Sequence, residues 1–164
     1  MSGRVAVLGA GFQGCCVALE LARRGVSVDL YDREDRCITQ AGFRNEGKIH
    51  LGLVYANDPT FTTARVMVRG ALEFGSAVRR WIERDLGDVC TPAPFDYVVH
   101  RDSMVSPETV AAHFATVDAC LRETASATCL SYLDDEGRTP CYRTASRQVA
   151  ARYDRDTILT VSLR

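Results

Sequence analysis

The feature that most constrains the fold is the glycine motif Gly9–Gly14, GAGFQG, which lies between an apolar run and a helical pattern. The preceding run, residues 4–8 (RVAVL), is typical of a parallel strand buried on both faces. Residues 12–24 have helical spacing, with Val17, Ala18, Leu21 and Ala22 on the inward side. Gly25 ends this helix, and residues 27–31 (SVDLY) predict a second strand. This order predicts an α/β fold that starts with a Rossmann-type βαβ unit and its parallel sheet.

Each glycine of the motif has a physical task in a dinucleotide site. Gly9 permits a tight turn, Gly11 lets a pyrophosphate approach the backbone, and Gly14 lets the helix pack closely on the strand. The helix N-terminus offers N–H groups and a positive dipole end to the phosphates. Asp32 ends the second strand, where a carboxylate accepts hydrogen bonds from ribose hydroxyls. Asp32 disfavours the 2′-phosphate of NADP, although the neighbouring Arg33 keeps that option open.

The composition excludes several classes of partner and site. With 164 residues and a net charge of −1, the chain suits one ordinary domain and shows no bias toward nucleic acid. The uncharged run 5–19 is too short to span a bilayer, so we expect no integral membrane segment. A secretory signal peptide stays a minor alternative for this run. The seven cysteines lack zinc spacing, which predicts no metal site and suits reduced thiols in a cytoplasmic protein.

The remainder of the chain predicts a mixture of helices and strands. Residues 33–57 are polar and rich in glycine, and Asp58 and Pro59 are expected to cap and open the longest helix. Helices are expected over 59–84, 106–123 and 144–153, and strands over 95–100, 130–133 and 158–163. Because the sequence stops within a β pattern, we expect an interrupted fold, which is either the N-terminal part of a longer protein or a truncated gene product.

A second motif occupies residues 42–55, GFRNEGKIHLGLVY. It combines glycines and polar groups with apolar side chains, so such a loop can pass close to a flat ring and still pack. Together with the first motif it resembles the FAD-dependent oxidoreductases of the D-amino-acid oxidase superfamily, and most closely the L-2-hydroxyglutarate dehydrogenase branch. The matching positions are Arg44, Asn45, Gly47, Ile49, His50, Gly52, Tyr55, Pro59, Ala64, Arg65 and Gly70. The sequence departs from the branch pattern at Glu46, Val54 and Thr63.

The resemblance implies that the cofactor is FAD and that residues 44–52 pass beside its pyrophosphate and isoalloxazine. His50 would lie near the flavin ring, which makes it the candidate catalytic residue. A structural histidine that bonds the backbone of the loop stays an equal alternative for this position. The expected cofactor-binding residues are Gly9, Ala10, Gly11, Phe12, Gln13, Gly14, Asp32, Arg33, Arg44, Asn45, Gly47, Lys48 and Ile49. Residues 1–90 would form the FAD-binding region, and residues 91–164 a partial β/α extension with incomplete substrate-domain elements.

The expected function is therefore FAD-dependent oxidation of a small hydroxy or amino acid, with hydride transfer to the flavin. The glycine motif alone does not separate FAD from NAD, because the two cofactors share an adenosine half. Two alternatives stay open: an NAD-dependent dehydrogenase, and a non-catalytic nucleotide-binding fragment. A small-molecule substrate is the expected partner, and the sequence does not indicate an oligomeric state. His100 and His113 are interpreted as structural or exposed, and Cys15 and Cys16 as packing residues.

Overall fold

The computed structural model describes residues 3–45, 47–82, 86, 95–100, 102–133, 141–144 and 158–161. The chain divides into two compact units, which we call unit 1 (Met1–Ile49) and unit 2 (His50–Arg164). The functional division expected between residues 90 and 91 stays a prediction, because compact packing does not show which residues bind a cofactor.

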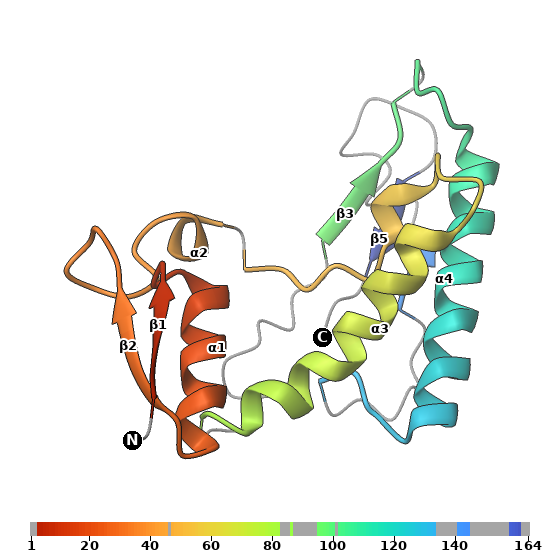
Figure 1. Ribbon diagram of the computed structural model, residues 1–164. Coiled ribbons are helices and arrows are strands. Elements are labelled where there is room, and N and C mark those ends of the chain that lie inside the picture. The colour runs from red at the N-terminus through yellow and green to blue at the C-terminus, as the bar shows by residue number, and fades with distance from the viewer. Residues whose placement is uncertain are drawn as a thin grey trace. The chain divides into compact units, whose positions relative to one another are not determined.

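Unit 1 contains the βαβ arrangement that the sequence predicts. Strand β1 (Arg4–Leu8) is followed by helix α1 (Phe12–Arg23) and strand β2 (Ser27–Tyr31) (Figure 1). The two strands pair in parallel, from Arg4 opposite Ser27 to Leu8 opposite Tyr31. Gly25, at φ +77°, follows the helix and donates its N–H to the carbonyl of Ala22 at 2.9 Å. The α/β fold class and its Rossmann-type start are confirmed.

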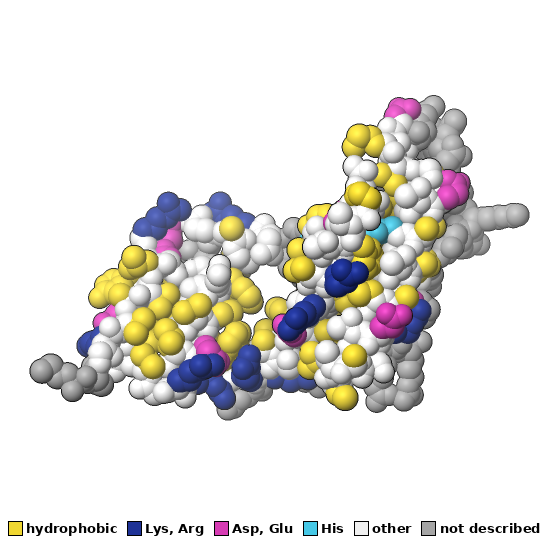
Figure 2. Space-filling model, turned by 45° about the vertical axis from the view of Figure 1, so that its right-hand side comes forward, with side chains coloured by type: hydrophobic (Ala, Val, Ile, Leu, Met, Phe, Trp, Pro, Cys, Tyr) yellow, Lys and Arg dark blue, Asp and Glu magenta, His cyan; other side chains and the backbone are white. Residues whose placement is uncertain are grey.

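The burial expected for these elements is wrong in part. β1 was expected to be buried on both faces, but none of its residues is buried, and Leu8 is 82% exposed. In α1, Val17 and Ala22 are exposed, whereas Ala18 and Leu21 are half-buried. The physical reason is the width of the sheet: in the part of unit 1 that the structure describes, it has two strands, which one helix covers only partly. Figure 2 shows the resulting apolar side chains at the surface of unit 1.

A short helix, α2 (Ala41–Arg44), completes the regular structure described in unit 1. Unit 2 contains the 3-10 turn η1 (Leu53–Tyr55), helices α3 (Thr62–Arg79) and α4 (Pro107–Thr128), and strands β3 (Phe95–Val98), β4 (Arg143–Thr144) and β5 (Ile158–Val161). The strands form an antiparallel sheet in the order β3-β5-β4, and α3 packs beside α4 (Figure 1).

The start of α3 differs from the expectation. The helix begins at residue 62 rather than 59, so Pro59 precedes its first turn. Asp58 still caps this region: its carboxylate accepts the N–H groups of Thr60 at 2.9 Å and of Thr63 at 3.2 Å. Asp58 thus closes a turn before the helix through Thr60 and also accepts one N–H of its first turn, that of Thr63. The helix expected to be the longest has 18 residues, whereas α4 has 22.

The start of α4 is as predicted. Ser106 is the N-cap and accepts the N–H of Thr109 at 3.2 Å, with Pro107 in the first turn. The helix continues to Thr128, five residues beyond the predicted end at residue 123. Cys129 then ends it in the left-handed conformation, at φ 55°.

The strand predictions have mixed outcomes. β3 confirms the strand expected at 95–100 over residues 95–98, and β5 confirms the strand expected at 158–163 over its described residues, 158–161. The strand expected at 130–133 is reduced to an isolated β-bridge at Tyr132, and Leu133 then lies in a turn at φ 47°. Of the helix expected at 144–153, Thr144 lies in β4 and the other residues lie outside the described part of the chain.

Most of the described core lies in unit 2, between α3 and α4. Val68 and Leu72 of α3, and Phe114 and Val117 of α4, are all at most 1% exposed. The ring of Phe114 contacts that of Tyr97 edge to face, with centroids 5.2 Å apart. This core supports the segment around residue 51, where the second motif continues. Across the described residues, we find no helix whose length and apolar character would let it cross a membrane.

Candidate functional site

The turn between β1 and α1 depends on two glycines. Gly9 has φ +100°, a conformation that side chains other than glycine's rarely adopt, and its N–H donates to the carbonyl of Tyr31 at 2.7 Å. A Cβ atom placed on Gly14 would lie 1.8 Å from the carbonyl oxygen of Gly9. The structure therefore shows both the tight turn and the close approach of helix to strand.

The N-terminus of α1 is open. Gly11 is the N-cap residue, and no side chain caps the helix. A Cβ atom at Gly11 would meet nothing within 4 Å, and Phe12 and Gln13, the next two residues, are both exposed. The first N–H groups of a helix have no acceptor within the helix and carry its positive dipole end. This end of α1 is therefore suited to an anionic group such as a phosphate.

Asp32, which follows β2, binds the turn through its carboxylate. Its Oδ2 accepts the N–H of Ala10 at 2.5 Å, and its Oδ1 accepts the N–H of Glu34 at 3.0 Å. The hydrogen bonds from the backbone of Glu34 and then of Ala10 hold the pKa of this carboxyl below its usual value. An ionised carboxylate has about four acceptor positions. Asp32 can therefore hold the turn and still accept hydrogen bonds from a ligand hydroxyl.

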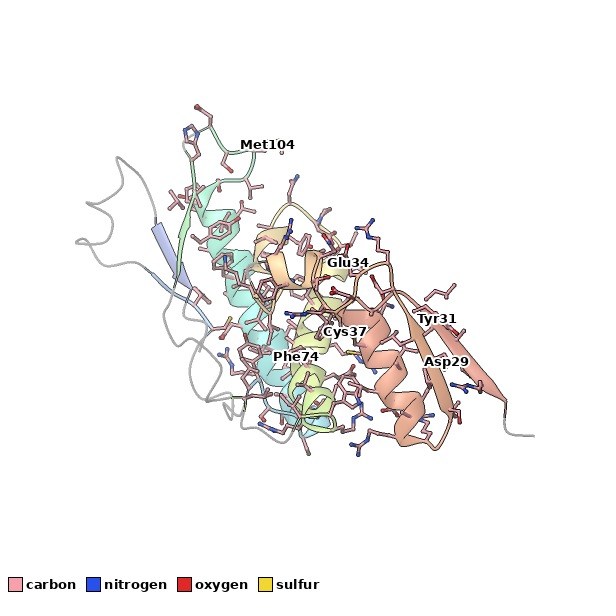
Figure 3. The ribbon with its side chains drawn as sticks, turned by 90° about the vertical axis from the view of Figure 1, so that its left-hand side faces the viewer. Asp29, Tyr31, Glu34, Cys37, Phe74 and Met104 are labelled. Carbon is pink, nitrogen blue, oxygen red and sulfur yellow. The ribbon has the colours of Figure 1, made fainter. Side chains whose placement is uncertain are left out.

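An open hollow of about 380 Å³ lies at this end of the strands. It is lined by Gly9, Tyr31, Asp32 and Arg33. Figure 3 shows Tyr31 and Glu34 at the end of β2 that borders this hollow. Tyr31 was not predicted as a site residue. Its position at the carboxyl end of a parallel strand, where ligands bind in such sheets, is the signal that could have identified it.

Helix α2 passes against the N-terminus of α1. A Cβ atom on Gly42 would lie 2.8 Å from Cγ2 of Ile38 and 3.7 Å from Cβ of Phe12. Ile38 in turn donates its N–H to the carbonyl of Ala10 at 2.8 Å. The start of the second motif therefore lies beside the glycine turn, within unit 1. Gly42 is a further residue that the motif comparison did not single out.

The next residues form a small turn closed by Asn45. Its Oδ1 accepts the N–H of Gly47 at 2.7 Å, and its Nδ2 donates to the carbonyl of Gly42 at 3.2 Å. Gly47 has φ +62°, so this position also favours glycine. Glu46, one of the departures from the branch pattern, lies outside the described residues. Of the other predicted cofactor residues in this segment, Arg44 and Lys48 are exposed and Ile49 is half-buried.

His50 begins unit 2, whereas the residues predicted to bind the cofactor all belong to unit 1. The His50 side chain is exposed, and the next residue, Leu51, is 2% exposed. Gly52 has φ +90°, and a Cβ atom there would lie 2.6 Å from Cα of Ala64. The carbonyl oxygen of Gly52 lies 3.0 Å from Nε2 of His113 on α4. His113 thus contacts the second motif across 61 positions of sequence, a relation that spacing alone does not predict.

The paired cysteines at the start of α1 have no sign of activation. Burial raises the pKa of both the Cys15 and the Cys16 thiols above the ordinary value. The Cys15 thiol donates to the carbonyl of Ala10 at 3.3 Å. Both observations favour packing over nucleophilic chemistry, because the thiolate is the reactive form of cysteine.

Comparison with known protein families gives one match. Residues 4–137, well over half of the chain, match the family DAO, described as FAD dependent oxidoreductase. The chain matches no curated protein and no solved structure.

Proposed function

Because the chain belongs to the DAO family of FAD-dependent oxidoreductases, we propose that it oxidises a small hydroxy or amino acid with a bound FAD as hydride acceptor. The observation that carries the proposal is the pairing of an uncapped α1 N-terminus with Asp32 across one glycine turn. These groups match the two polar parts of the ADP half, its pyrophosphate and its ribose.

The residues of unit 1 fit the ADP half in charge and in space. The N–H groups at the start of α1 would face the pyrophosphate, and the open space at Gly11 leaves room for it. Asp32 would accept from the ribose hydroxyls, since a carboxylate has about four acceptor positions and the backbone hydrogen bonds of the turn do not fill them all. Gly9, Ala10, Phe12, Gln13, Gly14 and Arg33 complete the proposed ADP site.

We assign the flavin side of the cofactor to the segment from Arg44, the last residue of α2, to Ile49. Two exposed cations in this segment, Arg44 and Lys48, can offset the negative charge of the pyrophosphate. Asn45 and Gly47 form the turn between them, and Ile49 follows. The contact of Gly42 with the start of α1 supports this assignment, because it brings the segment to the phosphate end of the helix.

Oxidation of such a substrate breaks a C–H bond and an O–H or N–H bond and forms C=O or C=N. The flavin supplies the acceptor for the hydride. The proton needs a base, and we assign this role to His50, because histidine is the side chain most often used for general-base catalysis. Its exposure leaves the ring accessible to a substrate.

The substrate class rests on the second motif. Its resemblance to the L-2-hydroxyglutarate dehydrogenase branch favours a 2-hydroxy acid. The departures at Glu46, Val54 and Thr63 are reasons to test amino acids beside hydroxy acids.

The test is anaerobic reduction of the flavin. The full chain is loaded with FAD and mixed with a panel of 2-hydroxy acids and amino acids, while the absorption band of oxidised flavin in the blue is recorded. We expect one class of substrate to bleach the band. His50→Gln should slow bleaching at least about 100-fold, the usual contribution of a general base. The matched control, His100→Gln, changes an exposed histidine on the β3–α4 loop and should react as the wild type does.

Two outcomes would overturn the proposal. A colourless chain that binds NAD but not FAD would indicate the NAD-dependent alternative. A chain that binds FAD but is reduced by no member of the panel would indicate the non-catalytic alternative. If His50→Gln is bleached at the wild-type rate, His50 is not the base. The proposed FAD-dependent oxidation would then stand without that assignment.

A further inference from the structure

The segment that follows His50 is held by His113, which lies 61 positions away from Gly52 in the sequence. We propose that His113 is a positioning residue, which holds the carbonyl of Gly52 and thereby fixes the peptide that carries His50. The inference rests on the proposed function, because positioning matters for the reaction only if His50 takes part in it. His113 belongs to neither motif.

The hydrogen bond itself is directional. Nε2 of His113 lies 3.0 Å from the carbonyl oxygen of Gly52. A carbonyl oxygen only accepts, so Nε2 must carry the hydrogen and donate it. The same oxygen accepts the N–H of Tyr55 at 3.2 Å, which closes the turn η1. Both acceptor positions of this carbonyl are therefore used, one by the turn and one by α4.

Ring packing holds the His113 imidazole on α4. Its centroid lies 5.6 Å from that of Phe61 in an edge-to-face arrangement at 68°. It also lies 6.4 Å from the ring of Phe114, which is fully buried. Aromatic rings at such distances and angles attract each other beyond their shared burial. The position of the Nε2 donor is thus set by ring packing against Phe61 and Phe114, and not by the segment around Gly52 that it binds.

Packing on the other side fixes where the Gly52 peptide lies. A Cβ atom on Gly52 would clash with Ala64 of α3, so the backbone runs directly against that helix. Leu51 and Leu53 on either side are buried. The segment is therefore clamped between α3, which it touches with its backbone, and α4, which holds its carbonyl. His50 is the first residue before this clamp.

Two substitutions separate the hydrogen bond from the packing. His113→Gln keeps an N–H donor at a reach close to that of Nε2, whereas His113→Phe keeps a ring but removes the donor. Leu121→Ala is the control for loss of stability. Leu121 is buried on the same helix, about 12 Å along its axis from His113.

The first readout needs no cofactor. Hydrogen exchange of the amides at 53–55 is measured in the full chain by mass spectrometry. We expect His113→Phe to raise their exchange about fivefold, the effect of losing one ordinary hydrogen bond, and His113→Gln to restore most of the protection. Leu121→Ala should lower the melting temperature without loosening this segment selectively. Wild-type exchange in His113→Phe, or equal loosening in Leu121→Ala, would overturn the inference.

The second readout is the reduction rate of the FAD-loaded chain. We expect His113→Phe to lower the limiting rate of flavin reduction several-fold with little change in the half-saturating substrate concentration, and His113→Gln to recover that rate. A wild-type limiting rate in His113→Phe would overturn the link to His50. If the wild-type chain binds no FAD, the proposed function fails and the catalytic link fails with it. The exchange measurement still decides whether His113 holds the peptide.

Discussion

Gly11 and Gly14 belong to one motif, but the structure assigns them different physical tasks. At Gly14 a side chain has no room, because its Cβ would overlap the carbonyl of Gly9. At Gly11 a side chain has room, and the space that it would take lies at the open end of α1. Gly14 is therefore required for the fold, and we propose that Gly11 is required for the ligand.

This difference gives a paired prediction. Gly14→Ala should destabilise unit 1 by about 1–3 kcal/mol, the usual cost of overpacking, and should also abolish FAD binding. Gly11→Ala should melt as the wild type does but bind FAD at least about tenfold more weakly, because the methyl group competes with the pyrophosphate. Circular-dichroism melts and FAD titrations of both variants provide the measurement. Equal effects of the two substitutions on stability would contradict the assignment.

At the scale of elements, Asp58 connects the loop to the start of α3. The hydroxyl of Thr60 and the N–H groups of Thr60 and Thr63 donate to its carboxylate. These hydrogen bonds, with the Thr60 hydroxyl as the largest contribution, lower the pKa of Asp58 from 3.8 to about 2. A carboxyl whose pKa is lower in the folded state stabilises the fold when it is ionised.

The sign of the pH dependence follows. Asp58 contributes its full stabilisation above about pH 4, and that contribution is lost as the pH falls from 3.8 through about 2. The melting temperatures of the wild type and Asp58→Asn should therefore differ above pH 4 and converge as the pH approaches 2. Asp102→Asn, at an exposed carboxyl on the β3–α4 loop, serves as the control. A difference that stays constant down to pH 2 would contradict the role assigned to Asp58.

Elements with local signals could be predicted from the sequence. β1, α1 and β2 follow from the glycine motif, and the start of α4 follows from Ser106 and Pro107. The start of α3 could not, because an aspartate before a proline can cap a helix directly or close a turn first. The strand expected at 130–133 is present only as a bridge at Tyr132, and the left-handed conformation of Leu133 has no signal in its residue type.

Properties that depend on distant contacts were not predictable. The exposure of Leu8 depends on how many strands flank β1, and the number of neighbouring strands cannot be predicted from the residues of β1. The contact of His113 with Gly52 joins positions 61 residues apart. The sequence predicts Asp32 as a ribose-binding residue. It does not predict that the Asp32 carboxylate also accepts the N–H of Ala10.

At the scale of the whole molecule, the core and the proposed cofactor residues belong to different units. Unit 2 contains nearly all of the buried apolar residues described, whereas in the described part of unit 1 only Ala10 is a buried hydrophobic residue. A ligand that binds only the folded state stabilises it, by about 2.7 kcal/mol at 100 times its dissociation constant. A cofactor bound to unit 1 would therefore stabilise the unit whose described core is the smaller.

We propose that unit 1 binds FAD through the uncapped N-terminus of α1 and through Asp32. A calorimetric titration of the full chain with FAD and, separately, with NAD, in the wild type and in Gly11→Ala, tests this binding. We predict saturable binding of FAD with one site per chain, weaker or no binding of NAD, and a loss of FAD affinity in the variant. No binding of FAD, a preference for NAD, or unchanged FAD affinity in Gly11→Ala would contradict the claim.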